Sequence, residues 1–200
     1  MRVKICGITR AEDARLAAAL GAAAVGFVFW PRSPRCIHPD VARAIVADLP
    51  AHVRAVGVFV DQPVEEVARV VRTVGLGAVQ LHGREDSGPF EALGLPIIKA
   101  VAVGAGFVPA SVATIPPTVM VLLDAHDPAK RGGTGRTIDW SLAARVAATR
   151  DTVLSGGLDP ANVRAAIAQV RPYMIDVSSG VESVPGIKDP ARLRALFQEV

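Results

Sequence analysis

Cysteine is scarce in this sequence, which has only Cys6 and Cys36 among its 200 residues. Two cysteines cannot build a disulfide scaffold, and in a reducing compartment such thiols stay free unless they do redox work. Long apolar runs are missing as well. The longest, from Leu16 to Trp30, contains Gly21 and Gly26 and is shorter than the ~18–20 residues that cross a bilayer. The sequence therefore predicts neither a disulfide-rich secreted domain nor a membrane protein.

An excess of charge of one sign is nearly absent too. The chain has 22 Lys and Arg against 19 Asp and Glu, a net charge of +3, without a block of like charges. This balance does not predict a nucleic-acid partner, although it suits a small anionic substrate. The N-terminal segment from Met1 to Cys6 lacks the apolar core and cleavage site of a secretory signal. We expect a cytoplasmic protein.

The sequence is rich in an alternation of two kinds of segment. Half of its residues are hydrophobic, and short runs of Val, Ile and Phe alternate with Ala- and Arg-rich segments of helical spacing. The eight predicted strands are Arg2–Cys6, Ala24–Phe29, Ala55–Val60, Ala78–Leu81, Pro96–Val101, Val119–Asp124, Thr152–Ser155 and Met174–Val177. The predicted helices are Ala11–Leu20, Pro39–Asp48, Pro63–Val74, Glu85–Leu93, Trp140–Thr149, Pro160–Val170 and Asp189–Phe197. The segment 104–118 has three prolines and two glycines, which predict a loop with at most one short turn.

Eight strand–helix units in 200 residues match the lower end of (β/α)8 barrels, at roughly 200 residues. The alternative is an open, doubly wound sheet. Its dinucleotide fingerprint of three spaced glycines is absent from the first turn, Cys6 to Arg10. We find no linker, low-complexity tract or shift of composition. The sequence thus predicts an α/β protein, a single compact (β/α)8 TIM barrel domain over residues 1–200, with an irregular or short fifth helix.

The reactive groups of such a barrel lie at the carboxyl ends of its strands. The first predicted strand ends at Cys6, and strand alternation places Cys6 inside the barrel above Lys4, with Val3 and Ile5 outside. The Lys4 ammonium would then favour the thiolate form of Cys6. The alternative is that Cys6 is a small buried hydrophobic residue, as most free cysteines are.

Polar side chains end other predicted strands. Asp124 follows a fully apolar strand, where a carboxylate serves either as a functional acid or as a structural partner of the next loop or of an arginine. Gln80, His82 and Asp176 hold similar strand-end positions. Arg35 follows the second strand, where it is either a carboxylate ligand or a solvated surface residue.

Glycine-rich turns follow the last two predicted strands, at 154–160 and 176–180. Backbone N–H groups in such turns bind phosphate, and barrels often place their phosphate site there, although paired glycines also occur in ordinary turns. A third tract, Gly132–Gly135, is more typical of a mobile cover. The four histidines, His38, His52, His82 and His126, have no metal-ligand spacing, so we expect no metal site.

Several segments together resemble the phosphoribosylanthranilate isomerase family. They are Lys4–Thr9, Gly26–Phe29, Ser33–Arg35, Gly57–Phe59, Val79–Gly83, Gly132–Gly135, Ser155–Leu158 and Asp176–Glu182. Their order along nearly the whole chain is that of the family. The resemblance implies an eight-stranded barrel that catalyses the third committed step of tryptophan biosynthesis, an Amadori rearrangement of N-(5-phosphoribosyl)anthranilate. It implies no cofactor, and a monomer or a homodimer.

The resemblance also implies residue roles. The family's general base matches Cys6, its general acid Asp124, and its ligand for the anthranilate carboxylate Arg35. Its phosphate-binding positions match Gly156, Gly157, Ser178 and Ser179, while Gln80, His82 and Asp176 match positions near the sugar. Other interpretations are a histidine-pathway isomerase, a dual-substrate isomerase and a phosphosugar-binding regulator without turnover. The histidine-pathway isomerases that this chain resembles have an aspartate at the position of Cys6, so Cys6 argues against the first of these interpretations. A thiol redox protein would need a Cys-x-x-Cys motif, which the sequence lacks.

Overall fold

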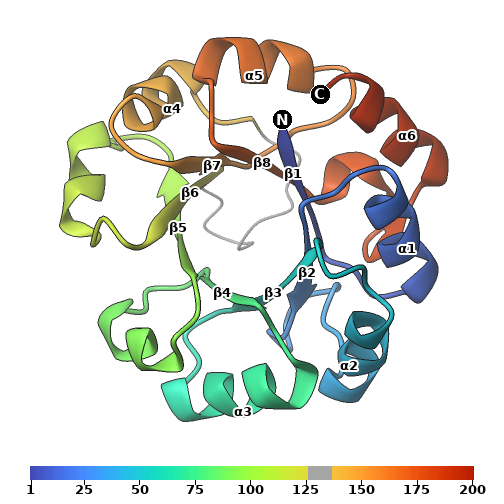
Figure 1. Ribbon diagram of the computed structural model, residues 1–200. Coiled ribbons are helices and arrows are strands. Elements are labelled where there is room, and N and C mark those ends of the chain that lie inside the picture. Colours follow the sequence, from blue (N-terminus) through green and yellow to red (C-terminus); the bar gives the residue numbers. More distant parts are fainter. Residues whose placement is uncertain (126–136) are drawn as a thin grey trace.

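The computed structural model describes residues 1–125 and 137–200. Eight parallel strands close into a barrel in sequence order, because β1 pairs with both β2 and β8 (Figure 1). The strands are β1 (Arg2–Cys6), β2 (Ala24–Val28), β3 (Arg54–Phe59), β4 (Ala78–Leu81), β5 (Ile97–Val103), β6 (Met120–Ala125), β7 (Thr152–Leu154) and β8 (Met174–Val177). The predicted barrel is confirmed, with strand ends that shift by at most two residues.

Helices surround the barrel (Figure 1). They are α1 (Ala11–Ala19), α2 (Pro39–Ala47), α3 (Val64–Val74), α4 (Trp140–Ala147), α5 (Val163–Val170) and α6 (Pro190–Gln198). Two 3₁₀ helices, η1 (Gly88–Leu93) and η2 (Pro109–Thr114), follow β4 and β5. The short turn expected within 104–118 is confirmed as η2.

Two helix predictions were wrong. The helix predicted at Glu85–Leu93 is the shorter η1, since Glu85 instead accepts hydrogen bonds from the backbone N–H groups of Asp61 and Gly83. The helix predicted from Pro160 begins at Val163. Asp159 accepts hydrogen bonds from the N–H groups of Ala161 and Asn162, which hold the chain in a turn before the helix.

Sequence reasoning missed a small hairpin after β8. A 3₁₀ turn, η3 (Ser179–Val181), leads into β9 (Glu182–Val184), which pairs antiparallel with β10 (Ile187–Lys188). Strands of three and two residues are too short for an alternating pattern to be recognised. This hairpin lies against the carboxyl end of β1, as described below.

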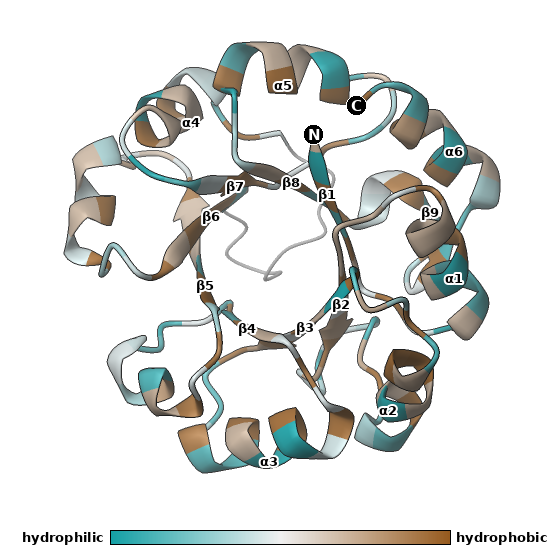
Figure 2. Ribbon diagram, viewed as in Figure 1, coloured by the Kyte–Doolittle hydropathy of each residue, from teal (hydrophilic) through white to brown (hydrophobic). Residues whose placement is uncertain are grey.

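Two apolar layers hold the barrel. The outer layer lies between strands and helices and includes Val3, Ile5, Phe27 and Val79. The inner layer fills the barrel with Ala24, Val56, Ala78, Ile98, Leu122 and Val153. In Figure 2 the strands are mostly hydrophobic, whereas the surrounding helices mix both kinds of residue. The predicted alternation of β1 is confirmed, because Val3 and Ile5 belong to the outer layer while Cys6 packs with the interior residues Val28 and Val58.

Within the described residues, no helix combines the length and the apolar character that a membrane span needs.

Candidate functional site

Cys6 ends β1 and faces the barrel interior, with 8% of its surface exposed. Its partner across the strand pair is Gly26 of β2. A Cβ atom at Gly26 would lie 2.8 Å from the Cys6 Sγ and 3.1 Å from the Lys4 Nζ. The absence of a side chain at Gly26 therefore makes room for both the thiol and the ammonium.

Lys4 lies one layer below the thiol and is fully buried. Its Nζ donates a hydrogen bond to Oδ1 of Asp176, 2.9 Å away on the adjacent β8. Burial alone would lower the pKa of Lys4, but the charges of Asp176 and Cys6 outweigh it, and the pKa is raised. The structure places Lys4 below Cys6, as the sequence predicted, whereas its ion pair with Asp176 was not predicted.

The pKa of the Cys6 thiol is raised, and burial is the main cause. Lys4 acts in the opposite direction through its charge and its hydrogen bond, as the sequence predicted, while Asp176 partly cancels it. Lys4 therefore lowers the pKa of Cys6 as expected, but the increase caused by burial is larger. Thiolate formation in this place depends on the cations around it.

Asp124, His82 and Gln80 form a second polar group at the same end of the barrel. Oδ2 of Asp124 lies 3.3 Å from Nε2 of His82, whose Nδ1 lies 3.0 Å from Nε2 of Gln80. The N–H of Ala125 donates to Oδ1 of Asp124 at 2.9 Å. Three predicted site residues from β4, its following loop and β6 are therefore joined into one chain of polar contacts. Oε1 of Gln80 is buried without a hydrogen-bond partner in the described part of the molecule.

The glycine turns after β7 and β8 lie against each other. Gly156 and Gly157 have φ angles of 86° and 64°, in the left-handed region that favours glycine. A Cβ at Gly156 would lie 2.9 Å from the Ala125 nitrogen, next to Asp124, and one at Gly180 would overlap the carbonyl oxygen of Leu158. Ser178 donates its hydroxyl hydrogen to the Cys6 carbonyl at 3.1 Å. The predicted phosphate-binding turns thus adjoin both the thiol and the carboxylate.

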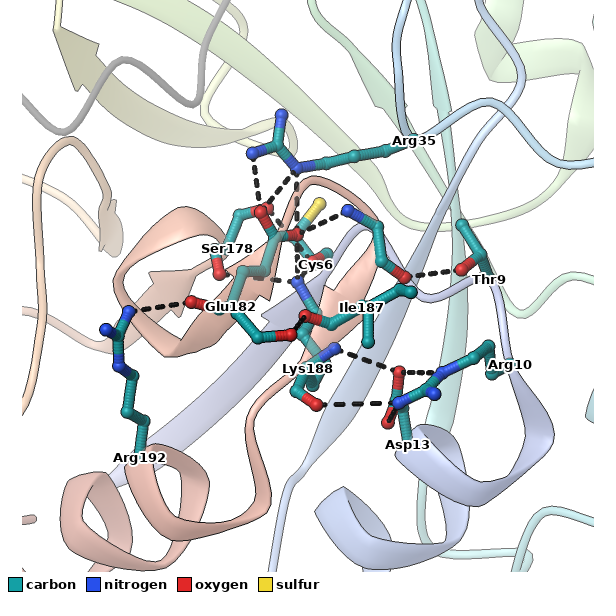
Figure 3. Close-up of polar contacts among 12 residues, drawn as sticks. Cys6, Thr9, Arg10, Asp13, Arg35, Ser178, Glu182, Ile187, Lys188 and Arg192 are labelled. Atoms are coloured by element: carbon teal, nitrogen blue, oxygen red, sulfur yellow. Dashed lines mark hydrogen bonds and ion pairs between the residues drawn. The ribbon is translucent and has the colours of Figure 1, made fainter.

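Arg35 extends from the loop after β2 over Gly7, where a Cβ would lie 2.5 Å from the arginine Cδ. Its Nε donates to Oε1 of Glu182 at 2.9 Å and its Nη2 to Oε2 at 2.6 Å (Figure 3). Burial would raise the pKa of Glu182, but the hydrogen bonds of Arg35 and the charge of Lys188 outweigh it and lower the pKa. The arginine is held in place by a buried carboxylate, so it is not a solvated surface residue.

Sequence reasoning assigned no role to Glu182 or Lys188. Both are almost completely buried, at 5% and 1% exposed, and their side chains contact each other. Burial is unusual for Lys and Glu and requires partners. One signal in the sequence pointed to Glu182, which stands two residues after the turn at 176–180.

Among residues 1–125 and 137–200, no cluster of three or more His, Cys, Asp or Glu side chains has the arrangement to hold a metal ion. The glycine tract Gly132–Gly135, predicted as a cover, and His126 lie outside the described residues.

Comparison with known proteins gives consistent results. A family model described as N-(5′-phosphoribosyl)anthranilate (PRA) isomerase matches residues 3–199. An N-(5′-phosphoribosyl)anthranilate isomerase from Pseudomonas fluorescens is 46% identical over all of this chain and 95% of the relative. The crystal structure of phosphoribosyl anthranilate isomerase from Thermus thermophilus is 46% identical, with a TM-score of 0.91, over 100% of this chain and 98% of the other.

A further solved isomerase structure contains reduced 1-(o-carboxyphenylamino)-1-deoxyribulose 5-phosphate. It is 42% identical to this chain, with a TM-score of 0.85, and the match covers 100% of this chain and 97% of that one. Family model, relatives and structures agree over essentially the full length. The chain therefore belongs to the N-(5′-phosphoribosyl)anthranilate isomerase family.

Proposed function

We propose that this protein converts N-(5-phosphoribosyl)anthranilate into 1-(2-carboxyphenylamino)-1-deoxyribulose 5-phosphate in tryptophan biosynthesis, with Cys6 as general base and Asp124 as general acid. The observation that carries the assignment is their placement. A thiol at the end of β1 and a carboxylate one residue before the end of β6, each with its own polar partner, lie at the same end of one closed barrel. This is the end where such barrels place their chemistry.

The first step opens the furanose ring. The aniline nitrogen pushes its electron pair toward C1′, the bond to the ring oxygen breaks, and that oxygen takes a proton from Asp124. Next, Cys6 as thiolate removes the proton from C2′, and the electrons of that bond neutralise the iminium to give an enolamine. Transfer of a proton to C1′ and loss of the 2′-hydroxyl proton give the ketone, so the reaction is an isomerisation without net gain or loss of atoms.

His82 and Gln80 hold Asp124 for this exchange. If the Gln80 amide donates to Nδ1 of His82, then Nε2 of that ring carries the hydrogen and points it at Asp124, 3.3 Å away. A donor on one oxygen and the Ala125 N–H on the other fix the plane of the carboxyl group. A fixed acid keeps the orientation that accounts for much of the rate.

The substrate has an anionic group at each end, a carboxylate and a phosphate, and each has its own binding site. Arg35 takes the anthranilate carboxylate, while the turns with Gly156, Gly157, Ser178 and Ser179 take the phosphate. The contact between these turns supports one shared anion site. Asp176 lies near the sugar, and its hydrogen bond with Lys4 below the thiol holds its carboxylate in place.

The test is the loss of anthranilate fluorescence of the substrate on adding purified protein. We expect Cys6→Ser and Asp124→Asn each to lower kcat by roughly 10²–10⁴-fold, the usual contribution of a general acid or base, with product still bound. Cys36→Ser is the matched control, because Cys36 is exposed. Wild-type turnover in either site variant would remove that residue from its role, and an inactive parent would favour a phosphosugar-binding regulator.

We also propose that residues 1–200 act as one catalytic domain in the cytoplasm, as a monomer or a homodimer. A Thermotoga maritima relative with a solved structure is described as dimeric. Sedimentation equilibrium of the purified chain, with and without product, distinguishes the two assembly states.

A further inference from the structure

Lys188, at the end of β10, reaches the carboxyl end of β1 from outside the barrel strands. Its side chain is 1% exposed. Its Nζ lies 2.5 Å from the carbonyl oxygen of Cys6, 2.8 Å from Oε1 of Glu182 and 3.3 Å from the carbonyl oxygen of Ser178. An ammonium group has three N–H donors, and three acceptors surround this one. Burial lowers the pKa of Lys188, and the charge and hydrogen bond of Glu182 act against burial to favour the ammonium form.

Glu182 is shared between two cations. Figure 3 shows its carboxylate between the Arg35 guanidinium and the Lys188 ammonium. The N–H of Gly186 also donates to Oε1 at 3.2 Å. The Glu182 carboxylate thus connects Arg35 to Lys188, and Lys188 in turn contacts the backbone at Cys6 and Ser178.

The hairpin that carries Lys188 is itself fixed to the first strand–helix unit. The Lys188 N–H donates to the buried Asp13 of α1 at 3.1 Å, and the Thr9 hydroxyl donates to the Gly186 carbonyl at 2.5 Å (Figure 3). Arg10 pairs with Asp13 at 2.7 Å. A lysine on a two-residue strand is thereby placed as firmly as one in the barrel.

The charges around the thiol are unequal. In the described part of the molecule, Lys4 and Lys188 act on Cys6 as cations and Asp176 as an anion, while Glu182 pairs with both Lys188 and Arg35. Among these five side chains, with Lys188 as ammonium, the positive charges exceed the negative ones by one, and a Cys6 thiolate would balance them. Lys188 and Lys4 both lower the pKa that burial raises. Without Lys188 the excess charge disappears.

We propose that Lys188 is a positioning residue for Cys6, and that Glu182 joins Lys188 to Arg35 so that the base, the carboxylate-binding arginine and the phosphate turn keep one fixed arrangement. The role rests on the proposed function of Cys6. Lys188 contacts the Cys6 backbone and supplies charge, whereas the thiol itself reacts. The negative charge of Glu182 partly cancels the electrostatic effect of Arg35 and Lys188 on the thiol.

Two substitutions have opposite expected effects on the thiol. Lys188→Met removes a cation and should shift the acid limb of the kcat/KM profile to higher pH, with roughly tenfold less thiolate at a given pH below it. Glu182→Gln removes the anion between two cations and should shift that limb to lower pH. It should also raise KM, because Arg35 loses its fixed position. If Lys188→Met does not fold, Lys188→Gln keeps polar donors without the charge.

A second measurement reads the thiol directly. The ultraviolet absorbance of the thiolate is titrated in a Cys36→Ser background, with Cys6→Ser/Cys36→Ser as the blank, so no substrate is needed. Arg164→Met and Glu199→Gln are the matched controls, since they break an exposed ion pair of 2.7 Å and should shift neither curve.

The outcomes separate this inference from the function itself. An active parent whose thiol titration is unchanged in Lys188→Met, or moves the same way in Lys188→Met and Glu182→Gln, overturns the role of Lys188. An inactive parent with opposite shifts of the titration refutes the proposed function and leaves the electrostatic coupling standing.

Discussion

The two ends of the barrel differ in how they treat charge. At the carboxyl end, buried Lys4, Asp176, Glu182 and Lys188 are all paired. At the amino end, a cavity of about 260 Å³ is lined mainly by apolar side chains and by the basic residues Arg2, His52 and Arg54, and Lys4 also reaches it from within the barrel. Among the residues that the structure describes, no Asp or Glu side chain lines this cavity. The apolar inner layer separates the two ends.

The difference has a physical cause. Strand–helix loops at the carboxyl end are long enough to bring in partners such as Arg35 and Lys188, and buried charges need such partners. The amino end has only short returns from helix to strand, so its charges stay in water. The inner apolar layer therefore provides most of the stability, and the carboxyl end of the barrel provides the chemistry.

Leu122 and Asp124, two residues apart on β6, offer the sharpest test of this division. Leu122 is fully buried in the inner layer. We expect Leu122→Ala to lower the free energy of unfolding by about 2–5 kcal/mol, because it removes buried methyl groups and leaves a cavity. Urea unfolding measures this loss. The folded fraction of Leu122→Ala should keep its kcat. Asp124→Asn should instead lose kcat and keep most of its free energy of unfolding. Equal losses of kcat in both variants would contradict the separation of stability from chemistry.

Glu182 links the carboxyl end to stability at low pH. Its folded pKa lies below the ordinary value of 4.5. Its stabilisation is therefore present above that value and is lost as the pH falls through the folded pKa. Relative to Glu182→Gln, the parent should be more stable by roughly 1–3 kcal/mol at neutral pH, and this difference should shrink as the pH falls below 4.5.

Urea midpoints of both proteins across this range test the prediction. Glu199→Gln, on an exposed pair, should show a far smaller difference at every pH. A parent advantage that grows on acidification would contradict the assigned direction.

The smallest effect is expected at the amino end. The Arg2 guanidinium lies 4.2 Å from the centroid of the Tyr173 ring. An exposed cation–π contact contributes about 0.5–1 kcal/mol, so Arg2→Met should shift the unfolding free energy by no more than that and leave kcat/KM unchanged. A large change in kcat/KM would mean that the two ends are coupled, contrary to the comparison.

The periodicity of the sequence was enough to predict the strands and most helices, because apolar alternation and first-turn prolines determine the conformation of neighbouring residues. It failed at Glu85 and Pro160, where side chains bond to backbone and override helical propensity. It also missed β9 and β10, whose position depends on contacts with Thr9 and Asp13, far away in the chain.

The site divides in the same way. Cys6 and Asp124 were predicted from strand-end positions, since a polar residue after an apolar strand is visible in one dimension. The position of Lys4 beside Cys6 was predicted as well, but the long-range pairings were not, because Lys4 meets Asp176 across 172 positions and Lys188 meets the Cys6 carbonyl across 182.

The sequence by itself therefore determined the barrel and the side chains at its carboxyl end, through local periodicity and strand length. Only the tertiary structure decided which charges neutralise one another around the thiol. Ion pairing depends on distance in space, which closure of the barrel creates between residues that are remote in the chain.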